Sequence, residues 1–192
     1  MTKLMMLLLA VWWWATLAPP VKDFTLPSVS GKQVGLKDYP NAKGFILIFT
    51  CNHCPFAKLY PDRINALHDQ FAPLGVPVLA ISSTDTVAYE EDGFPQMQQR
   101  ATEGNYRFPY LYDRYQTVAK DFNANKTPHA FVIWRTGDQY TIRYSGAIDD
   151  NGAHPDEVKN AYIKDAVEAL LNGQKVKITQ TASIGCKIYF RN

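Results

Sequence analysis

The sequence predicts an α/β fold in which helices flank a central mixed sheet, with a β-hairpin at the start and a helical insert. Apolar runs of strand length alternate with longer segments whose apolar residues recur every three or four positions. Their order is hairpin, strand, helix, strand, helical insert, strand, strand and helix. With 192 residues, 46% of them apolar, the chain can form one domain with a sizeable core, and its net charge of +2 is too small to indicate a nucleic-acid partner.

Residues 1–18 differ from the rest of the chain and have the pattern of an export signal. Lys3 and the amino terminus are positive, residues 4–17 are apolar but for one threonine, and no acidic residue precedes Asp23. A membrane-spanning helix needs about 20 residues, so this shorter run fits a secretory signal with cleavage near Ala18. Three consecutive tryptophans favour retention at a membrane, so a tether through residues 4–17 stays open. Either way we expect the folded part to be exported, periplasmic or membrane-tethered facing the periplasm.

The strand predictions rest on short apolar or β-branched runs bounded by turn residues. Hairpins are predicted over 23–27 with 33–36 and over 131–134 with 140–144, and further strands over 45–49, 76–82 and 108–112.

The helix predictions rest on apolar residues spaced by three or four. Helices are predicted from Cys54 to Phe71, around Phe94–Ala101, after Asp113, and from Pro155 to Gly173. Pro61 falls inside the first of these and should kink it. Asp113 is a candidate N-cap of the third helix, and Gly173 should end the last one.

A C-x-x-C motif stands where the first buried strand gives way to a helix, in the segment Phe49-Thr50-Cys51-Asn52-His53-Cys54-Pro55. A cysteine at a helix start faces unpaired N–H groups and the positive end of the helix dipole, and both favour the thiolate. Cys54, one turn later, is within reach to close a disulfide. A structural zinc site needs four ligands, usually from two such pairs, and the sequence has no second C-x-x-C. The motif therefore predicts redox chemistry.

These features together resemble the thioredoxin superfamily, and within it the redoxin branch of alkyl-hydroperoxide-reductase and thiol-specific-antioxidant type. The resemblance covers roughly residues 21–173. It rests on Asp23-Phe24-Thr25-Leu26 with its hairpin, on the cysteine pair, and on Lys126-Thr127-Pro128 before a strand. It implies a thioredoxin-like fold. It also implies that Pro128 follows a cis peptide bond, packs against the cysteines and, with Thr127, shapes the substrate groove.

The chain departs from the peroxiredoxin pattern P-x-x-x-T-x-x-C, in which the final cysteine attacks peroxide. Counted back from Cys51, the proline and threonine positions hold Gly44 and Ile48; counted back from Cys54, they hold Leu47 and Cys51. Neither cysteine fits the pattern, so a dedicated peroxidase is disfavoured.

The chain also lacks the buried aspartate that thioredoxins keep six residues before the first cysteine, where this sequence has Phe45. His53 precedes Cys54, as in the periplasmic disulfide-forming oxidases, which this motif resembles locally. We expect it to stabilise the Cys51 thiolate, which lowers the pKa of Cys51 and makes the disulfide a stronger oxidant. The alternative, in which His53 points into solvent, stays open.

Two further groups leave alternatives open. A copper chaperone on this fold would use two cysteines and a histidine, which Cys51, Cys54 and His129 could supply. Cys186 is the odd thiol, in a tail whose alternating residues after Gly185 suggest an added edge strand. It either resolves a mixed disulfide or is a small buried residue.

The sequence therefore predicts an export signal or anchor at 1–18, a thioredoxin-like domain at 21–173, and an extension at 174–192 that carries Cys186. The expected function is that of an exported thiol–disulfide oxidoreductase in which an exposed Cys51 attacks, Cys54 resolves and His53 tunes. We expect no cofactor and no metal ion. The expected partners are protein thiols and disulfides and an upstream redox partner. The alternatives are a redoxin-type thiol peroxidase and a copper-binding chaperone.

Overall fold

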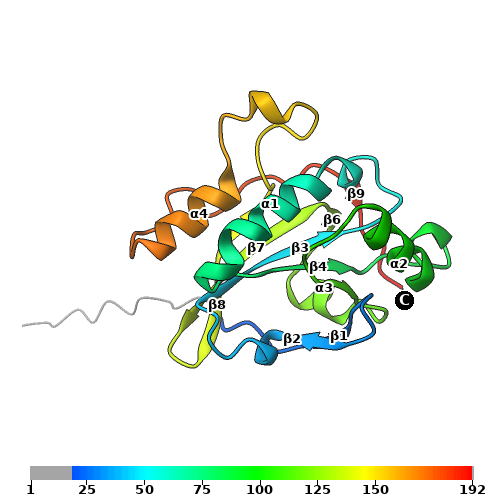
Figure 1. Cartoon of the computed structure of the whole chain (residues 1–192), viewed down its shortest axis with the longest axis horizontal. Coiled ribbons are helices and arrows are strands. Elements are labelled where there is room, and N and C mark those ends of the chain that lie inside the picture. Colours follow the sequence, from blue (N-terminus) through cyan, green and yellow to red (C-terminus); the bar gives the residue numbers. More distant parts are fainter. Residues whose placement is uncertain (1–18, 192) are drawn as a thin grey trace, which may run out of the picture.

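The computed structural model describes residues 19–191 (Figure 1). Its strands are β1 Thr25–Pro27, β2 Gln33–Gly35, β3 Gly44–Thr50, β4 Val78–Ser82, β5 Tyr110–Tyr112, β6 Lys126–Thr127, β7 His129–Thr136, β8 Gln139–Gly146 and β9 Cys186–Lys187. Its α-helices are α1 Pro61–Phe71, α2 Phe94–Glu103, α3 Thr117–Asp121 and α4 Tyr162–Leu171. The predicted export signal at 1–18 lies outside the described residues. Between residues 19 and 191 no helix has the length and apolar character needed to cross a bilayer.

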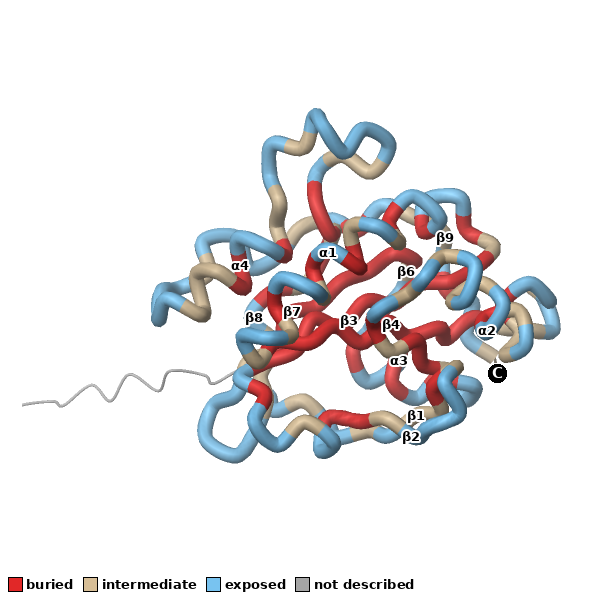
Figure 2. The backbone as a smooth tube through the Cα atoms, in the orientation of Figure 1, coloured by how far each residue is buried: buried red, intermediate tan, exposed pale blue. Residues whose placement is uncertain are grey.

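A mixed five-stranded sheet forms the centre of the molecule, in the order β5-β4-β3-β7-β8. β3 and β5 both run parallel to β4, whereas β7 runs antiparallel to β3 and to β8. β3 and β4 are buried along their whole length, and Figure 2 shows them in the buried centre of the molecule. Burial on both faces explains why these strands are continuous apolar runs in the sequence.

The side chains of β3 alternate between two cores, because successive residues of a strand point to opposite faces of the sheet. Phe45, Leu47 and Phe49 pack in one apolar cluster with α3, and Ile46 and Ile48 pack in the other with α1 and α4. Figure 1 shows α1 and α4 on one side of the sheet and α3 with the β1–β2 hairpin on the other. The predicted mixed sheet with helices on both faces is confirmed.

The helix predicted from Cys54 to Phe71 begins only at Pro61, because the preceding residues form tighter turns. Ala57–Leu59 is a short 3₁₀ segment, and the Tyr60 N–H bonds to the Ala57 carbonyl at 3.2 Å. Proline suits the first position of an α-helix, where its missing N–H needs no partner. The prediction that Pro61 kinks a longer helix is therefore wrong, since Pro61 starts α1.

The last helix is also shorter than predicted. Pro155–Glu157 forms a 3₁₀ turn, and the α-helix starts only at Tyr162. The Asp150 carboxylate, which precedes the 3₁₀ turn, accepts hydrogen bonds from the backbone and side chain of Asn160, at 3.0 and 2.7 Å, and so closes a loop ahead of α4. Gly173 has a φ of 69°, the left-handed conformation that ends helices, as predicted.

The tail also forms the additional strand that its alternation suggested, but not at the edge of the central sheet. β9 pairs antiparallel with β6, so that Cys186 lies opposite Thr127 and Lys187 opposite Lys126. An isolated bridge between Ser145 and Gln180 joins an earlier part of the tail to β8. The C-terminal residues therefore run from β8 to the short strand that precedes Pro128.

Candidate active site

The two cysteines of the C-x-x-C motif follow β3 and face the residue pair that precedes β7. The Sγ of Cys51 lies 3.1 Å from the Thr127 hydroxyl, and the Cys54 thiol donates to the Thr127 carbonyl at 3.1 Å. The peptide bond between Thr127 and Pro128 is cis, which confirms what the resemblance implied. One loop and one strand entrance thus bring together the predicted cysteines and the predicted groove residues.

Neither cysteine of the motif is exposed. Cys51 is 5% exposed and Cys54 is fully buried; they cluster with Ala57, and Cys186 packs against the cluster. All three cysteines are free thiols in this structure. The expectation of an exposed Cys51 is therefore wrong for the arrangement in which the tail lies on β6.

The pKa of Cys51 is raised, not depressed as predicted. Burial is the largest cause and brings the pKa to about 12; the carboxylate of Asp92 contributes in the same direction. The hydroxyl of Thr127 and the backbone N–H of Cys54 oppose this rise without cancelling it. The expected helix dipole is missing because the chain turns after Cys51 and the next helical segment is a 3₁₀ turn at Ala57. Cys51 is thus protonated at neutral pH.

Cys54 has the opposite tendency. Burial acts to raise its pKa, but donors around its sulfur outweigh burial and lower the pKa below the ordinary value. The largest of these is the Cys186 thiol, followed by the backbone N–H groups of Ala57 and Cys186. Of the two motif cysteines, Cys54 is therefore the sulfur that the surrounding residues prepare to carry negative charge.

A buried carboxylate that the sequence analysis missed lies beside this pair. Asp92 is fully buried, and its Oδ1 accepts the backbone N–H groups of Asn52 at 2.5 Å and His53 at 3.2 Å. It thus fixes the loop that carries the motif, and it places a buried carboxylate within 4.8 Å of the Cys51 sulfur, whereas Phe45 offers none. Asp92 ends the acidic run Glu90–Asp92, a pattern that usually indicates a solvated loop, so no local signal singles it out.

His53 is held against Asp92 instead of pointing into solvent. Its Nδ1 lies 2.5 Å from the Asp92 Oδ2, and its ring stacks on Tyr89 with centroids 3.9 Å apart and an interplanar angle of 8°. The alternative of a solvent-facing His53 is therefore wrong. A tuning effect of His53 on Cys51 remains a prediction, and this geometry would transmit it through the Asp92 carboxylate.

Cys51, His53 and Asp92 are also the residues that could hold a metal ion. One ligand atom from each lies within 4.8 Å of the other two. Both Asp92 oxygens, however, already accept hydrogen bonds from the loop or contact the His53 ring. This arrangement is that of a polar network that positions the motif.

His129 does not complete the copper site that the sequence left open. Its Nε2 lies 3.1 Å from the Ser145 hydroxyl, and its ring packs on Phe131 with centroids 4.4 Å apart. Burial first, and then the charge of Lys126, lowers its pKa to about 4. Among the described residues His129 does not join the group of candidate metal ligands around Cys51, so the copper alternative lacks its third ligand.

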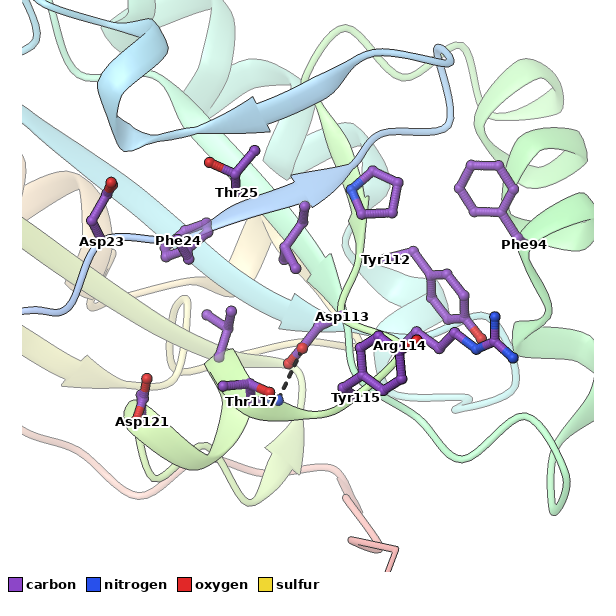
Figure 3. Close-up of a pocket in the computed structure, with 13 residues that line it drawn as sticks. Asp23, Phe24, Thr25, Phe94, Tyr112, Asp113, Arg114, Tyr115, Thr117 and Asp121 are labelled. Atoms are coloured by element: carbon purple, nitrogen blue, oxygen red, sulfur yellow. Dashed lines mark hydrogen bonds between the residues drawn. The ribbon is translucent and has the colours of Figure 1, made fainter.

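A groove of about 630 Å³ lies away from the cysteines, between the β1 segment and the residues of β5 and α3 (Figure 3). Figure 3 shows the Asp113 carboxylate accepting the Thr117 N–H, at 3.0 Å, and its other oxygen accepts the Ala119 N–H. Asp113 thus accepts N–H groups in the first turn of α3, but the N-cap position predicted for it is held by Gln116. The groove contains no cysteine or histidine, so the candidate chemistry lies at the cysteine pair.

The AhpC/TSA family model matches residues 18–153 of this sequence. The chain belongs to the AhpC/TSA family. Two solved structures share its fold over almost the whole length. A hypothetical protein from Sinorhizobium meliloti is 32% identical, with a TM-score of 0.82 over 92% of this chain and 95% of that chain. An uncharacterized conserved protein from Geobacillus kaustophilus is 35% identical, with a TM-score of 0.82 over 91% and 92%.

The fold of this AhpC/TSA family member is thioredoxin-like. A putative thiol:disulfide interchange protein, DsbE, from Chlorobium tepidum has a TM-score of 0.62 over 80% of this chain and 96% of that chain, at 18% identity. At that identity the likeness concerns the fold alone. No curated protein matches the sequence.

Proposed function

We propose that this AhpC/TSA family member is a thiol–disulfide oxidoreductase that exchanges disulfides through Cys51 and Cys54. The observation that carries the proposal is that both sulfurs contact Thr127, directly before the cis-proline. The backbone edge at Lys126–Thr127, which β9 occupies in this structure, can bind an extended segment of a partner by strand addition when that segment takes the place of β9. A partner sulfur held there would lie beside the cysteine pair.

We assign to Cys51 the mixed disulfide with the partner sulfur, and to Cys54 the resolution of that mixed disulfide. In the oxidising direction, a partner thiolate bonds to the Cys51 sulfur, the Cys51–Cys54 bond breaks, and Cys54 leaves as a thiolate. The lowered pKa of Cys54 supports this assignment, because a thiol of lower pKa is a better leaving group. A second partner thiolate then attacks its own mixed-disulfide sulfur, which closes the partner disulfide and releases Cys51 as the reduced thiol.

A peroxidase reading has less support. A peroxidatic cysteine must be a thiolate at neutral pH, whereas burial raises the pKa of Cys51 to about 12. Ile48, which stands where the peroxiredoxin pattern has threonine, is fully buried in the apolar core and offers no hydroxyl to a peroxide.

Trapping experiments test this function. Cys54→Ala should accumulate mixed disulfides between Cys51 and partner proteins in cell extracts, because the resolving thiol is gone. The double variant Cys51→Ala, Cys54→Ala is the matched control and should trap none at this position. Rapid peroxide turnover by the wild-type protein, with Cys51 captured as a sulfenic acid and no trapped partner, would overturn exchange in favour of a peroxidase.

We also propose that the protein acts outside the cytoplasm, either released or tethered through residues 4–17. The support is the sequence pattern of residues 1–18. A fusion of this segment to a reporter that is active only after export tests the proposal, and a reporter that stays inactive contradicts it.

A further inference from the structure

The tail is fixed along the Thr127–Pro128 edge by contacts before and after β9. Ahead of the strand, Lys126 Nζ donates to the Ser183 carbonyl at 2.9 Å, and the Ser183 hydroxyl donates to the Pro128 carbonyl. Past it, the Ile188 N–H bonds to the Asn125 carbonyl at 2.9 Å. The tail therefore occupies the backbone edge that the proposed function assigns to a partner (Figure 1).

Further contacts hold the end of the tail. The Gln116 side chain donates to the Tyr189 carbonyl and accepts the Arg191 N–H, both at 2.8 Å, and Arg191 forms an ion pair with Asp85 at 2.7 Å. Anchors on both sides of β9 define where Cys186 lies. The position of Cys186 is thus fixed by contacts with the rest of the fold.

The tail places a thiol against the cysteine pair. Cys186 lies opposite Thr127 in the β6–β9 register and packs on the cluster formed by Cys51, Cys54 and Ala57. Gly185 permits this approach, because a Cβ at that position would come within 2.0 Å of the Thr127 carbonyl oxygen. Cys186 packs on this cluster and is the largest of the causes that lower the pKa of Cys54, whereas Cys51 faces the Thr127 hydroxyl.

We propose that Cys186 is a third redox cysteine, which exchanges with the Cys51–Cys54 disulfide to form an internal Cys54–Cys186 disulfide. The proposal rests on the proposed function, since it takes the disulfide of the motif as its starting point. Cys186 loses its proton to solvent and bonds to the Cys54 sulfur. The Cys51–Cys54 bond breaks, and Cys51 leaves with the electron pair and takes up a proton. One disulfide replaces another, so no oxidant or reductant is consumed.

The exchange would move the disulfide toward the surface, because the three cysteines differ in exposure. Cys51 and Cys54 are buried, whereas Cys186 is only half-buried. An internal disulfide to Cys186 therefore carries the oxidised state from the buried pair to a sulfur nearer the surface, without moving the tail off β6. In the dithiol form, burial and the contact with Cys54 raise the pKa of Cys186 to about 11. The second of these causes ends once Cys54 is in a disulfide.

Oxidation of the full-length Cys51→Ser variant tests the proposal directly, because it leaves only Cys54 and Cys186 as thiols. In a graded glutathione buffer, acid quenching and peptide mapping should show a Cys54–Cys186 cross-link and the loss of both free thiols. The positional control combines Cys51→Ser with Cys186→Ser and Lys187→Cys. Because neighbouring residues of a strand point to opposite faces, that control should form no cross-link to Cys54.

Mapping of the oxidised wild-type protein guards against a folding defect in the variants. A fraction of chains should carry the Cys54–Cys186 bond together with an alkylated Cys51. A wild-type protein that forms only Cys51–Cys54, with no cross-link in Cys51→Ser, would overturn this proposal and leave the proposed function standing. Equal cross-linking from position 187 would overturn it too. A wild-type protein that forms neither Cys51–Cys54 nor Cys54–Cys186 would instead remove the proposed function.

Discussion

Replacing Asp92 by asparagine should lower the pKa of Cys51 while keeping the motif loop in place. The backbone N–H groups of Asn52 and His53 both bond to the same carboxylate oxygen, Oδ1, and an amide oxygen can accept both. The amide NH₂ would then face the His53 Nδ1, which lies 2.5 Å from Oδ2. Asp92→Asn therefore removes one buried negative charge with little change in the hydrogen-bond partners.

The size of the effect follows from Coulomb's law. The Cys51 sulfur and an Asp92 oxygen are within 4.8 Å of each other, at which two unit charges repel by about 3.5 kcal/mol for an effective dielectric constant of about 20. That energy equals about 2.5 pKa units for a full unit charge, and the hydrogen bonds that Asp92 accepts reduce the effective charge that Cys51 experiences. We expect the pKa of Cys51 to fall by about 1–2 units. Burial remains, so the pKa should stay above that of an ordinary thiol.

The assay is the rate of alkylation against pH in a background with Cys54→Ser and Cys186→Ser, where only Cys51 reacts. Burial limits reagent access equally with and without Asp92→Asn, so the ratio of rates reports the thiolate fraction. At neutral pH the Asp92→Asn variant should react about 10 to 100 times faster. Asp69→Asn, at an exposed carboxylate of α1, is the matched control and should change nothing. Superimposable profiles, or a parent protein whose rate already levels off near about pH 6, would refute the reasoning.

Two further predictions concern stability. Arg63 Nη1 contacts the buried Asp149 carboxylate at 2.6 Å, so Arg63→Met should lower the free energy of unfolding in urea by about 3–5 kcal/mol. Arg107→Met, which breaks an exposed ion pair, should cost under about 1 kcal/mol, and equal losses would contradict the role of burial. Burial lowers the pKa of His129 from 6.5 to about 4, so the unfolded chain binds this proton first and stability falls as pH drops from 6.5 toward 4. His129→Gln retains a partner for Ser145 but cannot bind the proton. The fall in the free energy of unfolding between pH 6.5 and pH 4, measured in urea, should therefore be about 2–3 kcal/mol smaller in this variant than in the wild type. An unchanged pH dependence would speak against the role of His129.

The local sequence pattern was sufficient to predict the elements whose apolar residues follow one spacing throughout. The apolar run of β3 predicted a buried strand, and the turn residues around Gly31 predicted the β1–β2 hairpin. The cis bond before Pro128 came from the family resemblance, since no local property of Lys126-Thr127-Pro128 requires it. Where two signals competed, periodicity was the weaker guide. The apolar spacing after Cys54 continued through Pro61, but the ring of proline set the start of α1.

The candidate site could be predicted only as far as the motif itself. Asp92 is 40 residues from Asn52 and Cys186 lies beyond the last helix, yet both set the properties of the pair. Burial of Cys51, which decides the direction of its pKa, depends on how such distant segments pack. A helix-dipole argument made from neighbouring residues alone therefore gave the wrong sign.

Cys54 is the sulfur at which the two proposed reactions meet. It leaves when a partner attacks Cys51, and it is the target when Cys186 attacks. Cys51 is the free thiol when the internal Cys54–Cys186 disulfide is present, and Cys186 is the free thiol when the motif disulfide is present. In the dithiol form the pKa of Cys51 is raised to about 12 and that of Cys186 to about 11, with burial as the largest cause of each. The contribution of Cys54 ends when Cys54 enters a disulfide, but burial remains, so thiolate stabilisation favours neither disulfide. The balance between them is set by the geometry of the β6–β9 pairing, which is why moving the thiol by one residue along β9 is the decisive control.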